Sequence, residues 1–407
     1  MPGATIDHLV SLTIFIAALV LFMSLFSQSL QTAIVYQSNR QVAIKATELL
    51  DSISLSPGNP ANWGRSDVMP TSFGLQDNNT RGYVISPFSL MRLNSLSGVP
   101  VYYSKTGKWY SNVSMSSGGY LLVPLGECVN YTTATRLLGV NGSYGFQLAI
   151  TPILTVSVNE TRANPLQVKA GVSGPGFPLG NAYLNYTLTY AIRGAGNYPA
   201  FKTFKGSART DASGVATLDF AIDGSQNASA IIITAHLGGL YGVGYKCINT
   251  RSEVIIPFVK SFKNGTILLA HSWDLHNFPN PKALYYNATF LVLSANLAFN
   301  PIQMNGTVTG LVNYGGGQPY KQVQIPTSDP GILVVAFRNG TESGVSLLPW
   351  GIGSLGISFA YGENPSSSSD WVATDVRQVM VAGVSYQAKI ATWSLAGFPV
   401  SNPKWGP

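Results

Sequence analysis

The residues best placed to do chemistry lie in the segment AHSWDLHNF, which contains His271, Trp273, Asp274 and His276. Histidine and aspartate can act as general acid and base or as metal ligands. Side chains alternate along a strand, so His271 would face away from Asp274 and His276, and a metal site would need ligands from elsewhere. We therefore expect these residues to lie on a partly exposed strand or loop, with no catalytic or metal-binding role.

Motifs of the common enzyme classes do not occur in the sequence. It has no G-x-S-x-G, no P-loop and no H-E-x-x-H, and its 17 acidic residues are scattered. The glycines from Gly315 to Gly317 precede strand-like sequence rather than a helix that could bind phosphate. We expect a protein that is not an enzyme and has no cofactor. A secreted hydrolase built on a β-sandwich stays open as an alternative, since a fold alone does not exclude an active site.

Asparagine-linked glycosylation is the chemistry that the sequence indicates most strongly. Eleven N-x-[ST] matches lie beyond the first helix, and some N-G-[ST] steps also suit hairpin turns. Covalent glycans on several sites would mean that all later segments face the outside of the cell. The matched residues are Asn78, Asn112, Asn130, Asn141, Asn159, Asn185, Asn227, Asn264, Asn287, Asn305 and Asn339.

Composition and cysteine usage agree with export. Charged residues make up 10% of the 407-residue chain, against about 25% in a typical soluble domain. The net charge of +7 is spread thinly, which argues against a nucleic-acid partner. The two cysteines, Cys128 and Cys247, lack metal-ligand spacing. In an exported protein we expect them to form a disulfide, with two separate buried thiols as the alternative.

The N-terminal region is expected to form one long helix. Leu9 to Asn39 contains no Asp, Glu, Lys or Arg, and its first 18 residues reach about the minimum length that spans a bilayer. Apolar residues continue at helical spacing to Ile53, and Pro57-Gly58 ends the pattern. From Ile6 to Ile53 the helix would be about 70 Å long, more than twice the thickness of a bilayer core, so its second half must contact protein. The expected assembly face comprises Leu9, Leu12, Phe15, Ile16, Leu19, Phe22, Met23, Phe26, Leu30 and Ile34.

The segment TIDHLVSLTIFIAALVLFMSLFSQSLQTAIVYQSNRQVAIKATELL resembles archaeal type IV pilin-like proteins, in which a long apolar helix precedes a β-rich head. That resemblance implies a helix that lies in the membrane before assembly and packs in a filament core afterwards. The family's short basic leader is not found before this helix, where only Met1-Pro2-Gly3 stands. Asp7 either takes the role of the acidic residue of pilins or caps the helix start.

The rest of the chain has the strand and turn pattern of an all-β protein. Strand-like segments recur about every ten residues from Ile153, as a β-sandwich requires. GPGFPLGNAYLNYTLTY followed by TDASGVATLDF is similar to immunoglobulin-like modules of bacterial and archaeal surface proteins, and Gly214 would supply a positive φ in the turn. We predict a mainly β fold with one long N-terminal helix. The expected units are the helix at 1–55, a β-rich head at 56–150, an Ig-like sandwich at 151–258 and a second β-sandwich at 259–407.

Aromatic residues could form platforms for sugars or for partner subunits, although strand cores also use tyrosine heavily. They group at Tyr102, Tyr103, Trp109, Tyr110 and Tyr120, and at Tyr285 and Tyr286.

Taken together, these features favour a cell-surface filament subunit. Its helix would pack against copies of itself after leaving the membrane, and its glycosylated head would serve adhesion. The alternative is a monomeric, membrane-anchored surface adhesin or envelope-associated protein.

Overall fold

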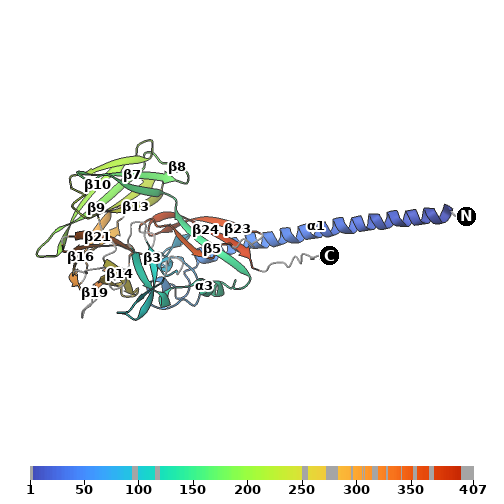
Figure 1. Cartoon of the computed structure of the whole chain (residues 1–407), viewed down its shortest axis with the longest axis horizontal. Coiled ribbons are helices and arrows are strands. Elements are labelled where there is room, and N and C mark those ends of the chain that lie inside the picture. Colours follow the sequence, from blue (N-terminus) through green and yellow to red (C-terminus); the bar gives the residue numbers. More distant parts are fainter. Residues whose placement is uncertain are drawn as a thin grey trace.

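The computed structural model shows a long helix that projects from a β-rich head (Figure 1). The structure describes residues 3–93, 100–114, 120–249, 255–271, 283–294, 297–304, 306, 308–313, 320–326, 329–340, 342–351, 355–365 and 371–395. The predicted fold class, mainly β with one long N-terminal helix, is confirmed.

Helix α1 (Gly3–Leu55) is continuous over 53 residues and includes all of the predicted span from Ile6 to Ile53. No glycine or proline interrupts the sequence between Gly3 and Pro57. The helix ends just before Pro57 because the residue that precedes a proline is disfavoured in the helical region. Two short helices, α2 (Pro87–Met91) and α3 (Tyr131–Leu137), lie in the head.

The head end of α1 packs against a five-stranded sheet made from both ends of the chain. Its strand order is β1-β23-β24-β5-β22, and α1 contacts β1, β23 and β24. The hairpin between β23 and β24 turns through Ala382 and Gly383, whose φ angles of 51° and 80° suit a two-residue hairpin. The strands are β1 (Val84–Ile85), β5 (Tyr144–Pro152), β22 (Phe359–Gly362), β23 (Ala373–Val381) and β24 (Val384–Ser394).

Two further sheets complete the body of the head. A six-stranded sheet has the order β19-β15-β14-β4-β3-β2, with β14 parallel to β4. Another has the order β17-β16-β20-β21, with β18 paired to β16. The strands of the six-stranded sheet are β2 (Val101–Tyr103), β3 (Lys108–Ser114), β4 (Tyr120–Pro124), β14 (Ile255–Ser261), β15 (Thr266–His271) and β19 (Tyr320–Gln324). Those of the other are β16 (Leu284–Leu293), β17 (Phe299–Ile302), β18 (Thr309–Val312), β20 (Gly331–Asn339) and β21 (Glu342–Trp350).

Residues 155–248 form a two-sheet antiparallel sandwich with its own core. One sheet is β10-β9-β12-β13 and the other β11-β7-β6, with β8 paired to β7. Gly214 has φ +77° before β11, as the turn prediction required. The strands are β6 (Thr155–Arg162), β7 (Leu166–Gly174), β8 (Phe177–Pro178), β9 (Tyr183–Arg193), β10 (Pro199–Arg209), β11 (Val215–Phe220), β12 (Ser229–Leu237) and β13 (Leu240–Ile248).

The four expected domains remain a prediction, but some strands pair with strands that were expected to belong to another domain. Strand β5, expected to belong to the head at 56–150, pairs with β24 near the C-terminal end of the described chain. Strand β14 pairs with β4 on one side and with β15 on the other. Residues after 258 are thus shared between sheets that also contain N-terminal strands.

Arg92 links the N-terminal loops of the head to the six-stranded sheet. Its side chain is completely buried. The guanidinium donates to the carbonyl oxygens of Ser66 at 2.8 Å, Val68 at 3.0 Å and Glu127 at 2.9 Å, and also to that of Trp63. Burial lowers the pKa of Arg92, although nearby acidic groups oppose this effect. A buried cation of this kind is tolerated because carbonyl acceptors satisfy its donors.

Candidate membrane-facing and assembly surface

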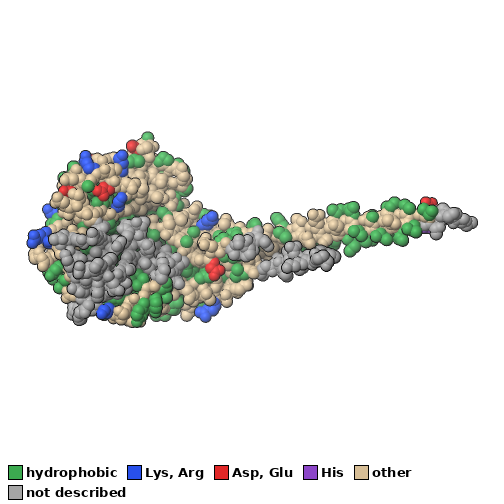
Figure 2. Space-filling view, in the orientation of Figure 1, with side chains coloured by type: hydrophobic (Ala, Val, Ile, Leu, Met, Phe, Trp, Pro, Cys, Tyr) green, Lys and Arg blue, Asp and Glu red, His purple; other side chains and the backbone are tan. Residues whose placement is uncertain are grey.

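The part of α1 that projects from the head is apolar and exposed. Every residue from Ile6 to Gln37 is exposed, and hydrophobic side chains cover much of the part farthest from the head (Figure 2). The ten predicted assembly residues are all exposed, with exposed fractions between 45% and 68%. They are Leu9, Leu12, Phe15, Ile16, Leu19, Phe22, Met23, Phe26, Leu30 and Ile34.

The apolar surface surrounds the helix rather than forming one stripe. Leu19, Val20, Leu21, Phe22 and Met23 are consecutive and all exposed, and five successive residues pass through more than a full turn. Leu9 to Phe26 spans about 27 Å at 1.5 Å per residue, close to the thickness of a bilayer core. The most apolar 18-residue window has a mean hydropathy of 2.7 and is 0% buried. By length and composition, α1 could therefore cross a membrane.

The uncharged segment from Ser27 to Gln37 also lies outside the head. Its residues are all exposed, including the apolar side chains of Leu30, Ile34, Val35 and Tyr36. The predicted contact of the second half of the helix with protein is made by the head only from Ser38 and Asn39 onward, where burial along α1 begins. Packing against the head therefore does not explain why this segment lacks charge.

A single buried stripe fixes α1 to the head. Val42, Ala46, Leu49, Leu50 and Ile53 are each at most 4% exposed, and their spacing places them on one helix face. They belong to the main core together with residues of β23 and β24.

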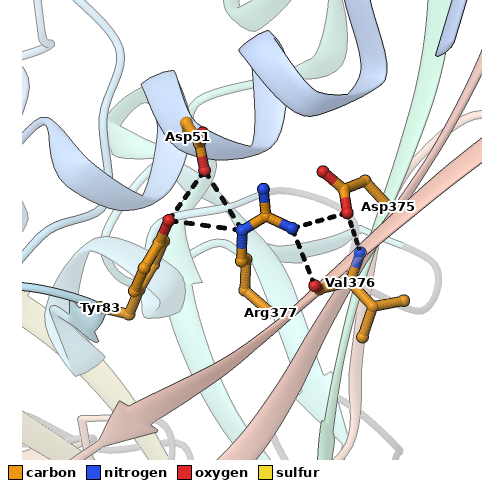
Figure 3. A network of polar contacts seen from close by, with 5 residues as sticks. All are labelled: Asp51, Tyr83, Asp375, Val376 and Arg377. Atoms are coloured by element: carbon orange, nitrogen blue, oxygen red, sulfur yellow. Dashed lines mark hydrogen bonds and ion pairs between the residues drawn. The ribbon is translucent and has the colours of Figure 1, made fainter. Parts of the chain in front are cut away.

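A polar network at the end of α1 adds to this packing (Figure 3). The Tyr83 hydroxyl donates to Asp51 Oδ1 at 3.0 Å, and Arg377 Nε lies 3.4 Å from the same oxygen. Arg377 also donates to Asp375 Oδ1 at 2.6 Å. Asp51 belongs to α1, Tyr83 lies just before β1, and Asp375 and Arg377 belong to β23. The network thus joins three segments that are far apart in the sequence.

The electrostatics of this network favour its charged form. Burial alone would raise the pKa of Asp375, but hydrogen bonds from Thr47, from the Val376 N–H and from Arg377 outweigh it, and the pKa lies below its ordinary value. The Tyr83 hydroxyl and Asp375 raise the pKa of Arg377. The arginine is therefore charged at neutral pH.

The predicted glycosylation sites have different environments. The side chains at Asn112 and Asn339 are not described, and Asn305 lies outside the described residues. Asn185, Asn227 and Asn287 are half-buried. The exposed sequon asparagines are Asn78, Asn130, Asn141, Asn159 and Asn264. An exposed side chain is open to modification, but the occupancy of every site remains a prediction.

The expected disulfide is absent: the structure holds Cys128 and Cys247 as separate thiols. Cys128 is buried just after strand β4, where its Sγ donates to the Pro124 carbonyl at 3.4 Å, whereas Cys247 lies in β13 of the sandwich. Burial raises the pKa of the Cys128 thiol to about 12, so it remains protonated at neutral pH.

Of the residues considered for catalysis, His271 alone lies within the described part of the chain. His271 ends β15 and is buried rather than exposed, while Trp273, Asp274 and His276 lie outside the described residues. Among the described residues, no group of three or more His, Cys, Asp or Glu could hold a metal ion.

The aromatic residues divide between core and surface. Tyr103, Tyr110 and Tyr286 are at most 2% exposed, whereas Tyr102 and Trp109 are 48% and 55% exposed. Tyr285 is half-buried, and the side chain of Tyr120 is not described. Alternation along β2 and β3 explains the division, because neighbouring side chains on a strand point to opposite faces.

None of the protein-family models and none of the curated proteins compared with the chain matches it. Several solved structures show limited similarity to the chain, and three of them are named here. The D0-D1 domain of intimin is 14% identical with a TM-score of 0.21, and the match covers 52% of this chain and 98% of that one. The BSP domain of a biofilm associated protein is 12% identical with a TM-score of 0.16, and the match covers 53% of this chain and 30% of that one. Trypsin-activated alpha-2-macroglobulin from Escherichia coli is 10% identical with a TM-score of 0.20, and the match covers 67% of this chain and 20% of that one. Scores this low carry no argument about fold or function, and the resemblance to archaeal pilins remains a prediction.

No sequence pattern predicted the network around Arg377. Asp51 could have attracted attention as an acidic residue at the end of an apolar stripe, but nothing local marks Arg377 as its partner. The two residues lie more than 300 positions apart in the chain.

Replacing Arg377 by leucine should weaken the attachment of α1 to the head. We expect Arg377→Leu to lower the free energy of unfolding by about 1–3 kcal/mol at neutral pH, because Asp51 and Asp375 lose their cation. Asp375 has a lowered folded pKa, so its contribution is complete above the unfolded pKa of about 3.9 and is lost as pH falls through the folded pKa. The variant should therefore lose less stability than the parent chain on acidification.

Denaturant unfolding of the full chain in detergent, followed by tryptophan fluorescence between about pH 7 and pH 3, measures both effects. Arg162→Leu is the matched control, because Arg162 pairs with Asp219 at 3.5 Å on the exposed surface. This control should change stability by less than about 0.5 kcal/mol. Equal effects of the two substitutions would show that the network does not hold the helix.

Proposed function

We propose that the chain is a membrane-anchored cell-surface protein, with residues 9–26 of α1 across the lipid bilayer and the β-rich head displayed outside the cell. One observation carries this proposal: an apolar, charge-free stretch of helix that is 0% buried by the chain itself. As a helix, the stretch satisfies its backbone groups internally, which a bilayer requires.

The energetics make exposure of this stretch to water untenable. Between Ile6 and Tyr36, eighteen large apolar side chains are exposed, and covering them would contribute on the order of 20 kcal/mol or more. That exceeds the usual net stability of a domain, about 5–15 kcal/mol. A surface of this kind must be covered, and lipid can cover all faces of the helix at once.

The composition of the head supports an outside location. Five of the sequon asparagines are exposed, and glycans on them would supply the hydration that the few charged residues do not. A binding role such as adhesion suits a head that is displayed outside the cell. The partners in this proposal are the membrane and covalent N-glycans, without nucleic acid, cofactor or enzymatic activity.

Charges in the middle of the apolar stretch should release the chain from membranes. Each aspartate at the centre of a membrane helix costs about 2.5–3.5 kcal/mol. We expect Ala18→Asp combined with Phe22→Asp to reduce the membrane-bound fraction at least tenfold. The measurement is membrane fractionation after an alkaline carbonate wash.

A matched double variant, Ala43→Asp with Ile44→Asp, places the same charges at exposed positions next to the head. It should remain in the membrane fraction. The proposal fails if the variant at 18 and 22 stays bound as tightly as the parent chain.

A filament built from copies of this chain is the second candidate, and a specific observation favours it. Leu30, Ile34, Val35 and Tyr36 are apolar and exposed, yet they lie beyond the 18-residue stretch that lipid would cover. Helices of neighbouring copies could bury them. An uncharged surface avoids burying unpaired ions in such a core.

Ile34→Asp distinguishes a filament from a single anchored molecule. In a filament the new charge would be buried among helices, so we expect sheared filaments to disappear while the membrane-bound fraction stays unchanged. Electron microscopy and sedimentation of sheared material measure the first quantity, and fractionation measures the second. Normal filaments from this variant, or none from the parent chain, would refute the filament candidate.

A further inference from the structure

A pocket in the head lies where strand β3 begins and strand β4 ends. Its volume is about 660 Å³, within the range of about 300–1,000 Å³ usual for ligand sites. The short 3-10 helix Leu125–Glu127 forms part of its wall. The side chains that could contact a ligand are Lys108, Trp109, Glu127 and Asn130.

One wall of the pocket carries an exposed aromatic surface. Trp109 lines the pocket and is 55% exposed, and its ring lies 5.2 Å from that of Tyr102, its cross-strand partner. By contrast, Tyr103 and Tyr110 face inward and pack on Phe258 at 4.4 Å and 4.8 Å. The core of this sheet is therefore complete without Trp109 and Tyr102.

Glu127 lines the pocket and is half-buried. Its Oε2 is buried and, among the described residues, has no hydrogen-bond partner. Arg92 does not satisfy this oxygen, because Arg92 donates to the backbone carbonyl of Glu127. Burial, and then the charge of Asp67, raises the pKa of the Glu127 carboxyl, while Lys108 and Arg92 oppose the rise. A buried polar atom without a partner costs stability, so a ligand donor that reached it would be favoured.

Lys108 adds a positive charge to the lining of the pocket. It is exposed and lines the pocket, and its formal charge balances that of Glu127. The pocket lining thus offers a carboxyl group, an ammonium donor and an aromatic face, and its two charged side chains carry opposite charges. A ligand with a fixed charge would meet a like charge on one of the two residues.

We propose that this pocket binds a neutral carbohydrate. A sugar ring has C–H groups on its faces and hydroxyl groups at its edges. The C–H groups would pack on the electron-rich face of Trp109. The hydroxyls would donate to Glu127 and accept from Lys108. This inference does not depend on whether lipid or other copies of the chain cover α1.

The sugar could come from the chain itself, because the sequon residue Asn130 lies on the pocket wall, or from another molecule. The Oδ1 of Asn130 accepts from the Thr133 N–H at 2.8 Å. That bond leaves the side-chain nitrogen, the atom to which a glycan attaches, outside the interaction. The pocket could therefore hold a glycan linked to Asn130 of the same chain or a glycan from another molecule.

The test uses the full chain in detergent with cellobiose, maltose and N,N′-diacetylchitobiose as probes, and saturation-transfer NMR as the readout. The parent chain is compared with Asn130→Gln, which cannot carry the local glycan. Trp109→Ala and Glu127→Gln remove the two main contacts. Trp371→Ala is the matched control, because Trp371 is an exposed tryptophan away from the pocket.

Binding of a probe to the parent chain that weakens at least tenfold in Trp109→Ala and Glu127→Gln, but not in Trp371→Ala, supports a glycan from another molecule. Binding that appears only in Asn130→Gln, and is lost when Trp109→Ala is added, supports the chain's own glycan. If Glu127→Gln fails to fold, the comparison of Trp109→Ala with Trp371→Ala tests the proposal, because both side chains are exposed. The proposal is overturned if no probe binds either form, or if Trp109→Ala leaves binding unchanged.

Discussion

An apolar helix that the chain leaves uncovered is the constraint on which the rest of the structure depends. From Ile6 to Gln37, α1 has no contact that buries it, and it carries no charge between Asp7 and Arg40. The burial of apolar side chains normally stabilises a fold, but the apolar side chains of this part of α1 are not buried by the chain itself. The head must therefore fold and hold the helix without help from the helix's most hydrophobic part.

The head meets this requirement at the last four turns of α1. The buried stripe from Val42 to Ile53 packs on β23 and β24, and Arg377 of β23 pairs with Asp51 of the helix. Strand β24 in turn pairs with β5. The last strand of the described chain therefore lies in the same sheet as β1, against which the end of α1 packs. Truncation near the C-terminus would remove the surface that holds the helix.

Local patterns predicted the elements but not their partners. The lack of glycine and proline and the helical spacing of apolar residues identified α1, and Gly214 identified a turn, because these features act within a few residues. The pairings of β5 with β24 and of β14 with β4 join distant segments, and no local pattern encodes them. The expected disulfide failed for the same reason. The apolar helix could be predicted from sequence, whereas the pocket beside Trp109 required the structure.

The central claim is that residues 9–26 lie in lipid. The most direct test attaches a spin label to one position at a time from Leu9 to Gln37 of the full chain in liposomes, with Cys128 and Cys247 replaced by serine. The account predicts that labels up to Phe26 contact dissolved oxygen and are shielded from a water-soluble nickel complex, and that labels from Ser27 onward contact the nickel complex. Access of the nickel complex to every position would contradict the account.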